Sequence, residues 1–140
     1  MPMHGIRGAI TIPEDRPEDL LAGTRRLLQA LLEANPSLKT TDLASAFFTT
    51  TADLVSAYPA RAARQCGWEA VPLMCSQEIP VPSGLPRCVR VLLLWNTELS
   101  QADIHHVYLE GAAQLRPDLS GDRSHTPSND STDENRKKTL

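Results

Sequence analysis

Apolar residues recur at helical spacing in one long segment of the chain. Six leucines between residues 20 and 32, together with Thr24, recur every three or four positions, which is the pattern of an amphipathic helix with one buried face. Asp15 and Glu18 stand just before this pattern with the spacing of a capping box, and Asn35-Pro36 interrupts it. We therefore expect a long helix that has Asp15 as its N-cap and ends at Asn35.

Shorter apolar segments surround this helix. Their β-branched and alternating residues predict strands over 3–12, 43–50, 68–74, 89–95 and 107–115. Short helices are predicted after Tyr58-Pro59 and after Ser100, and the prolines within residues 75–86 predict a loop. This order of elements predicts an α+β fold, a single domain with a mixed sheet of about five strands packed by helices.

The composition changes near residue 119. Residues 119–140 contain no aromatic residue, and their four acidic and four basic residues cancel. Such a segment cannot bury enough apolar surface to offset the entropy lost on ordering. We therefore predict a folded domain over residues 1–118 and a disordered polar C-terminal tail over residues 119–140.

Charge and missing signals exclude several classes of protein. A net charge of −3 argues against a nucleic-acid binder, and no apolar run approaches the roughly 18 residues of a membrane span. No secretory signal opens the chain, and three cysteines are an odd number without metal-binding spacing. We expect a cytoplasmic protein that binds no nucleic acid and no membrane. We also expect no metal and no cofactor, because His105 and His106 are adjacent and no glycine-rich phosphate loop is present.

Arginine is the residue type with the clearest chemical meaning. The 14 basic residues comprise 11 arginines and only three lysines, and Arg7 and Arg90 fall inside predicted strands. Each of these two could point outward, pair with a structural carboxylate or bind a ligand. Arg61 and Arg64 share one helix face, which could equally be a solvated surface. Taken together, arginines near element ends suit a carboxylate-bearing ligand, since the guanidinium binds carboxylate in a bidentate manner.

Several stretches match one known family in order and spacing. They are residues 5–9 (GIRGA), 57–68 (AYPARAARQCGW), 71–78 (VPLMCSQE), 87–91 (RCVRV) and 106–119 (HVYLEGAAQLRPDL). On these stretches the sequence resembles the AroH-class monofunctional chorismate mutases. The resemblance implies a pseudo-α/β-barrel homotrimer and the rearrangement of chorismate to prephenate in phenylalanine and tyrosine biosynthesis, a step of the shikimate pathway that needs no cofactor.

The resemblance also implies roles for individual residues. Arg90 would donate to the ether oxygen of chorismate, Arg7 and Tyr108 would bind a carboxylate, and Glu78 and Cys75 would contact the ring hydroxyl. The remaining substrate-binding residues would form a wall and lid, partly from a neighbouring subunit: Tyr58, Arg61, Arg64, Leu115 and Arg116. The site would be shared across the trimer interface, so an isolated subunit would be nearly inactive.

Two other functions use similar residues. A trimeric imine deaminase of a related fold also has an interfacial arginine, although its characteristic stretches are not found here. A non-enzymatic trimer that binds a small dicarboxylate would need the same arginines as the enzyme. Loss of chorismate with formation of prephenate separates both from a chorismate mutase.

Overall fold

The fold, seen in a computed structural model that describes residues 1–115, is built on one mixed sheet. Its strands are β1 (Met3–Thr11), β2 (Leu43–Thr50), β3 (Leu73–Gln77), β4 (Cys88–Asn96) and β5 (Val107–Leu109). Its helices are α1 (Pro17–Ala34) and α2 (Pro59–Gln65), with 3₁₀ turns η1 (Thr40–Asp42), η2 (Gln101–Asp103) and η3 (Glu110–Gln114). The predicted tail over 119–140, and the end of the predicted domain, lie outside the described residues.

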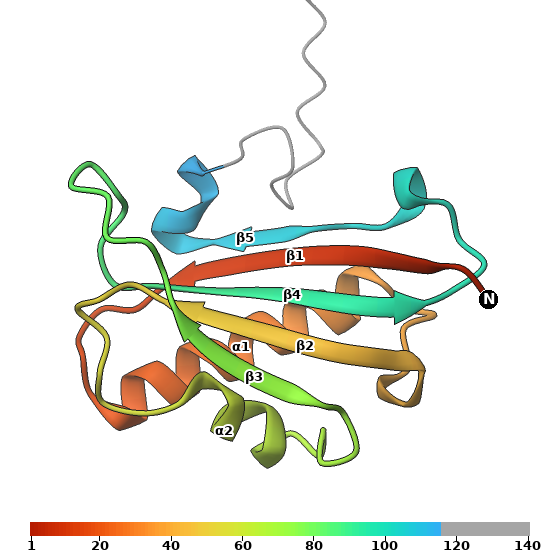
Figure 1. Cartoon of the computed structure of the whole chain (residues 1–140), viewed down its shortest axis with the longest axis horizontal. Coiled ribbons are helices and arrows are strands. Elements are labelled where there is room, and N and C mark those ends of the chain that lie inside the picture. The colour runs from red at the N-terminus through yellow and green to blue at the C-terminus, as the bar shows by residue number, and fades with distance from the viewer. Residues whose placement is uncertain (116–140) are drawn as a thin grey trace, which may run out of the picture.

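The strand order in the sheet is β3-β2-β4-β1-β5. β4 pairs antiparallel with both β1 and β2, whereas β5 is parallel to β1 and β3 is parallel to β2. Both α-helices cover the same face of this sheet (Figure 1). The expectation of an α+β fold with a mixed sheet of about five strands is confirmed.

The hydrophobic core lies between α1 and the helix-covered face of the sheet. Leu20, Leu27 and Leu31 are fully buried, as the helical spacing predicted, and they join Ile6 and Leu93 from β1 and β4 in one apolar cluster. Gly8 allows a close approach of α1 to β1, because a Cβ there would stand 3.0 Å from Leu31 Cδ1. Burial of these side chains at roughly 1.5–3 kcal/mol each fixes which face of the sheet α1 covers.

The opposite face of the sheet, which we call the open face, has no α-helix on it among the described residues (Figure 1). The strand registers place Arg7, Leu92, Phe47 and Met74 in one row across four strands of this face. All four side chains are exposed, Phe47 to 40% and Met74 to 62%. The open face therefore combines an arginine with apolar surface of the kind that a binding partner covers.

The start of α1 differs from the prediction. The N-cap position is Arg16, which makes no side-chain capping bond, and Pro17 is the first helical residue. Asp15 instead accepts hydrogen bonds from the backbone N–H groups of Val55 and Ser56, at 3.1–3.3 Å. The predicted capping box is wrong because the N–H groups of this loop compete successfully for the carboxylate.

Two predicted strands also lie elsewhere. The strand expected over 68–74 runs instead from Leu73 to Gln77, because Trp68 and Val71 are buried in a turn that follows α2. The strand expected over 107–115 stops at Leu109, where Glu110 takes a left-handed conformation (φ 53°) and starts η3. The loop expected over 75–86 accordingly begins at Glu78, three residues later than predicted.

Helix length and apolar content also bear on membrane insertion. Among residues 1–115, no helix has both the length and the apolar character that a bilayer crossing requires.

Candidate active site

Four strands of the open face bring together residues that are far apart in the sequence. Arg90 on β4 stands between Thr49 on β2 and Ala9 on β1, and Ala9 in turn pairs with Tyr108 on β5. Phe48 and Val91, which neighbour this row along their strands, point to the buried core, so the row itself faces the open side. Strand pairing therefore places Arg90 and Tyr108 on one surface.

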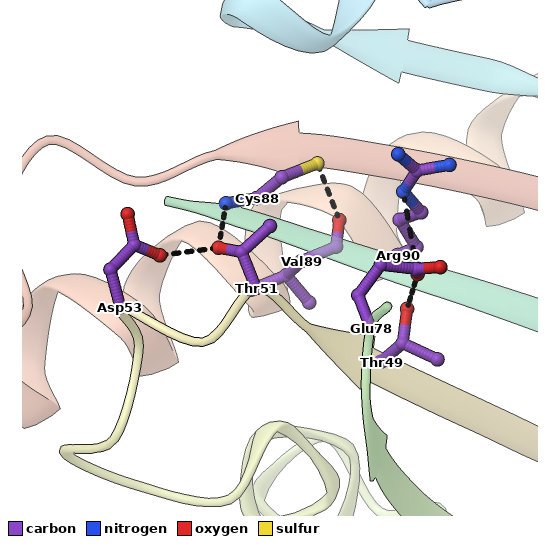
Figure 2. A network of polar contacts seen from close by, with 7 residues as sticks. All are labelled: Thr49, Thr51, Asp53, Glu78, Cys88, Val89 and Arg90. Carbon is purple, nitrogen blue, oxygen red and sulfur yellow. Dashed lines mark hydrogen bonds and ion pairs between the residues drawn. The ribbon is translucent and has the colours of Figure 1, made fainter. Parts of the chain in front are cut away.

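Glu78 is the acidic partner of Arg90. It follows β3 directly, and its backbone N–H donates to Thr50 O at 2.8 Å, which holds it beside β2. Its Oε2 lies 3.7 Å from Arg90 Nε and accepts a hydrogen bond of 2.8 Å from Thr49 Oγ1. Figure 2 shows the two terminal nitrogens of Arg90 on the side away from Glu78, where they can reach a ligand.

Two polar atoms near this row are buried without a hydrogen-bond partner in the described part of the chain. They are Arg90 Nε, whose ion pair with Glu78 is too long for a hydrogen bond, and the hydroxyl of Tyr108. A buried donor left unpaired costs about 1–3 kcal/mol, so such groups are characteristic of a site that a ligand completes.

Cys88 is a buried cysteine two residues before Arg90 on β4. It packs with Ala9, Tyr108 and Ala112 in a small second apolar cluster on the open face. Burial raises the pKa of the Cys88 thiol, and the positive charge of Arg90 only partly opposes this effect. Cys88 is therefore a neutral thiol at neutral pH and adds no negative charge next to Arg90.

A cleft of about 420 Å³ opens next to Glu78 and Arg90. Its other walls are the turn at 51–53 and the loop containing Ile79, Val81 and Leu85. The cleft thus offers the guanidinium of Arg90 and the carboxylates of Glu78 and Asp53 among apolar side chains. The guanidinium can bind an anionic group of a small ligand, and a carboxylate can accept a hydroxyl.

A second cleft of about 530 Å³ holds another part of the predicted site. Tyr58, Arg61 and Cys75 line it, together with residues of the 54–57 loop. Cys75 pairs with buried Phe48 and packs against the main core, so it faces away from the row that contains Arg90. Within one chain, Cys75 and Glu78 therefore line different clefts.

The other predicted site residues take separate positions. Arg7 is exposed on the open face opposite Leu92, and Arg64 is exposed on α2. Leu115 packs against the cluster around Tyr108 and Cys88. Arg116 lies outside the described residues.

Four polar residues near this site were not predicted from the sequence: Thr49, Thr51, Asp53 and Arg87. The last three support the start of β4. Asp53 accepts the hydrogen bond from Thr51 Oγ1 and from the N–H of Arg87, whose φ of 48° is left-handed. Thr51 Oγ1 in turn accepts the N–H of Cys88 at 3.0 Å. The threonine run at 49–51 indicates only that Thr49 and Thr51, which alternate along the chain, would share one face of a strand.

The described residues contain no cluster of three or more histidine, cysteine or acidic side chains that could hold a metal ion. What the site does offer is electrostatic: a guanidinium whose terminal nitrogens lie on the side away from Glu78, next to a carboxylate in a partly buried cleft. Such a group can bind an anion and can stabilise negative charge that develops on an oxygen during a reaction.

Comparison with known proteins relates the whole described region to one group of enzymes. The family described as "Chorismate mutase type I" matches residues 3–119. "Chorismate mutase AroH" of Thermus thermophilus is 54% identical over 117 residues, which cover 84% of this chain and 96% of the relative. The protein of the same name from Bacillus subtilis is 42% identical over 121 residues, 86% of this chain and 94% of the relative.

A solved structure gives the same relation at the level of the fold. A chorismate mutase from Clostridium thermocellum superposes with a TM-score of 0.77 at 44% sequence identity. The superposition covers 79% of this chain and 98% of that structure.

Proposed function

This chain belongs to the type I chorismate mutase family, the AroH class of isomerases, and from that premise we propose that it converts chorismate to prephenate in phenylalanine and tyrosine biosynthesis. In this rearrangement an ether C–O bond of the substrate breaks while a C–C bond forms, with no covalent link to the protein. The protein has to hold the substrate in a reactive conformation and stabilise the charge that separates as the C–O bond opens.

Arg90 carries the electrostatic part of the proposal. Its terminal N–H groups point away from Glu78 and are available to the ether oxygen, where negative charge accumulates as the bond breaks. Glu78 keeps one carboxylate oxygen, Oε1, without a hydrogen bond from the described residues, and in the proposal this oxygen accepts the ring hydroxyl of chorismate. Arg90 lies beside a cleft with its terminal nitrogens on the side away from Glu78. This is the observation that carries the proposed function.

Arg7 and Tyr108 provide the proposed contacts to a carboxylate of the substrate. Both lie on the open face, on the neighbouring strands β1 and β5, and the Tyr108 hydroxyl lacks a partner in the described residues. The proposal also retains Cys75 as a contact of the ring hydroxyl. Because Cys75 lines the other cleft of the chain, this contact requires the second cleft to face the first.

We further propose that the protein is a homotrimer with its active sites between subunits. In one chain, Tyr58 and Arg61 line one cleft while Glu78 and Arg90 line another, so a site that uses all four is completed by a second copy. The exposed apolar row of the open face supports an association of this kind. The neighbouring copy would supply Tyr58, Arg61 and Arg64, while Leu115 and Arg116 would close the rim.

The cytoplasm is the proposed compartment. All three cysteines lie in the described residues and are free thiols, as expected of a protein kept in a reducing compartment.

The test of the proposed function is turnover of chorismate by the purified protein. Loss of chorismate absorbance with prephenate as product is expected for the wild type. Arg90→Ala is expected to lower kcat by at least about 10²- to 10³-fold, because one preorganised donor to a developing oxyanion contributes that much.

Arg90→Lys is the matched control, since it keeps the charge and loses the planar fork. It is expected to retain more activity than Arg90→Ala and less than the wild type. Mass measurement by light scattering checks that both variants keep the wild-type assembly. Wild-type turnover in a folded Arg90→Ala protein would contradict the role of Arg90.

A further inference from the structure

We propose that Thr49 is a positioning residue for Glu78, which holds the Glu78 carboxylate at a fixed distance from Arg90. Thr49 lies directly opposite Arg90 in the antiparallel pair of β2 and β4, and its hydroxyl donates to Glu78 Oε2 at 2.8 Å. The inference rests on the proposed function, because it assigns Thr49 a part in the site formed by Glu78 and Arg90.

The geometry around Oε2 shows what the hydroxyl of Thr49 does. The same oxygen that accepts the Thr49 hydroxyl lies 3.7 Å from Arg90 Nε, beyond hydrogen-bond distance (Figure 2). A carboxylate free to move next to a guanidinium would close this gap and form a bidentate pair. Because Thr49 holds Oε2, the terminal N–H groups of Arg90 and the second oxygen of Glu78 stay available for a substrate.

Glu78 needs such a partner because little else holds its side chain. It lies beyond the last residue of β3, on the loop that lines the cleft, and its side chain is about one-third exposed. Among the described residues, Thr49 makes its side-chain hydrogen bond and Arg90 its ion pair. Without the Thr49 hydroxyl, the orientation of the carboxylate would depend on Arg90 alone.

Thr49 is suited to this work by its position and by its side chain. It lies one residue before the end of β2, where it and both its neighbours pair with β4, and a β-branched residue has restricted rotation about χ1, so the hydroxyl keeps one direction. Thr51, two residues further along the same face, has a different task. Its hydroxyl bonds Asp53 and the backbone N–H of Cys88, and it therefore braces the chain rather than the carboxylate.

The experiment compares Thr49→Val, which removes the hydroxyl at nearly constant shape, with Thr49→Ser, which keeps it. Thr49→Val is expected to lower kcat/KM for chorismate by about 10- to 100-fold, the size of one hydrogen bond to a charged group. Thr49→Ser is expected to stay within a few-fold of the wild type. Thr51→Val is the matched control, expected to lower Tm with a smaller effect on kcat/KM.

A double-mutant cycle separates positioning from general damage. In a Glu78→Ala background, Thr49→Val is expected to cause little further loss, because the group it positions is gone. The inference is overturned if Thr49→Val matches the wild type, if the two losses simply multiply, or if Thr51→Val lowers kcat/KM as much. Thr49→Ala serves in place of valine if that variant does not fold. A wild-type protein without chorismate turnover would instead overturn the proposed function.

Discussion

At the scale of the residue, the carboxylate of Asp15 sets the path of the loop that leads into α2. It accepts the backbone N–H groups of Val55 and Ser56, and this loop ends at Tyr58, close to Arg61. The hydroxyl of Ser56 and these two N–H groups lower the pKa of Asp15. The charged form of Asp15 is therefore favoured in the folded protein, and Asp15 contributes to stability only while it is ionised.

Asp15→Asn is expected to lower Tm at pH 7. Because the pKa of Asp15 is depressed by folding, its contribution is complete above the unfolded value of about 3.8 and is lost as the pH falls below it. The Tm difference between wild type and Asp15→Asn should therefore shrink when the melting curves are measured at pH 3. A difference that is equal at both pH values would show that Asp15 does not act through its charge.

Some residues of the site could be predicted from the sequence, and others could not. Arg90 and Arg7 could be selected because a guanidinium inside an apolar strand is costly unless it is exposed, paired or bound to a ligand. Thr49 could not, because a threonine in a strand is ordinary and its meaning depends on what the register brings beside it. Arg87 was not predicted as a site residue, whereas its left-handed backbone and its Nε–H bond to Ile12 O fix the entry to β4.

At the scale of the element, the end of α1 is tied to the segment before β5 through Asn35. This side chain is 3% exposed, and its amide donates to Leu31 O and to His105 O while its oxygen accepts the N–H of His105. One asparagine thus ends the helix and anchors the chain that leads to Tyr108. From the sequence, Asn35-Pro36 indicated only a stop.

Asn35→Ala is expected to lower the free energy of unfolding by about 2–4 kcal/mol, since three hydrogen bonds are lost and the backbone C=O and N–H of His105 lose the side chain that they bond. Urea denaturation followed by circular dichroism measures this loss. Asn96→Ala is the control, because its amide makes a single long bond of 3.4 Å to Asp42 O and should cost under about 1 kcal/mol. Equal losses in the two variants would contradict the anchoring role of Asn35.

The ends of elements with a regular apolar pattern were predicted well. The bounds of elements that depend on pairing with a distant part of the chain were not. The strand over 43–50 and the long helix ended where the pattern ended. β3 starts at Leu73 because it pairs with β2 from Ala46 onward, whereas Trp68 and Val71 are apolar for core packing without being in a strand. The local pattern of apolar residues indicates which side chains are buried, but it does not distinguish a buried turn from a buried strand.

At the scale of the whole molecule, the two faces of the sheet differ in whether helices cover them. The helices bury one face, while Leu92, Phe47 and Met74 leave a continuous apolar row on the other. If copies of the chain meet on this face, their association would account for the exposed apolar row. It would also account for the division of the predicted site between two clefts. A single sequence shows neither feature directly, because both depend on which strands become neighbours.

Phe47→Asp is expected to dissociate the assembly, because a carboxylate would have to be desolvated in the interface. Phe47 is 40% exposed in one chain, so the subunit itself should stay folded. Light scattering coupled to size exclusion measures the mass, and chorismate turnover should fall with it. Gln29→Asp, at an exposed position of α1 away from the open face, should keep the wild-type mass. Unchanged mass for Phe47→Asp would contradict an interface at this row.

The strand order has a consequence for how the protein is made. β1, which leaves the ribosome before the other strands of this sheet, lies between β4 and β5 and finds its partners only among residues 88–109. Until that part of the chain has been synthesised, β1 has neither of its neighbours in the sheet, and the long-range pairing that follows is slow. Assembly of the sheet therefore waits for the synthesis of residues 88–109. Until then the nascent chain carries an apolar strand that has no neighbouring strand to pair with.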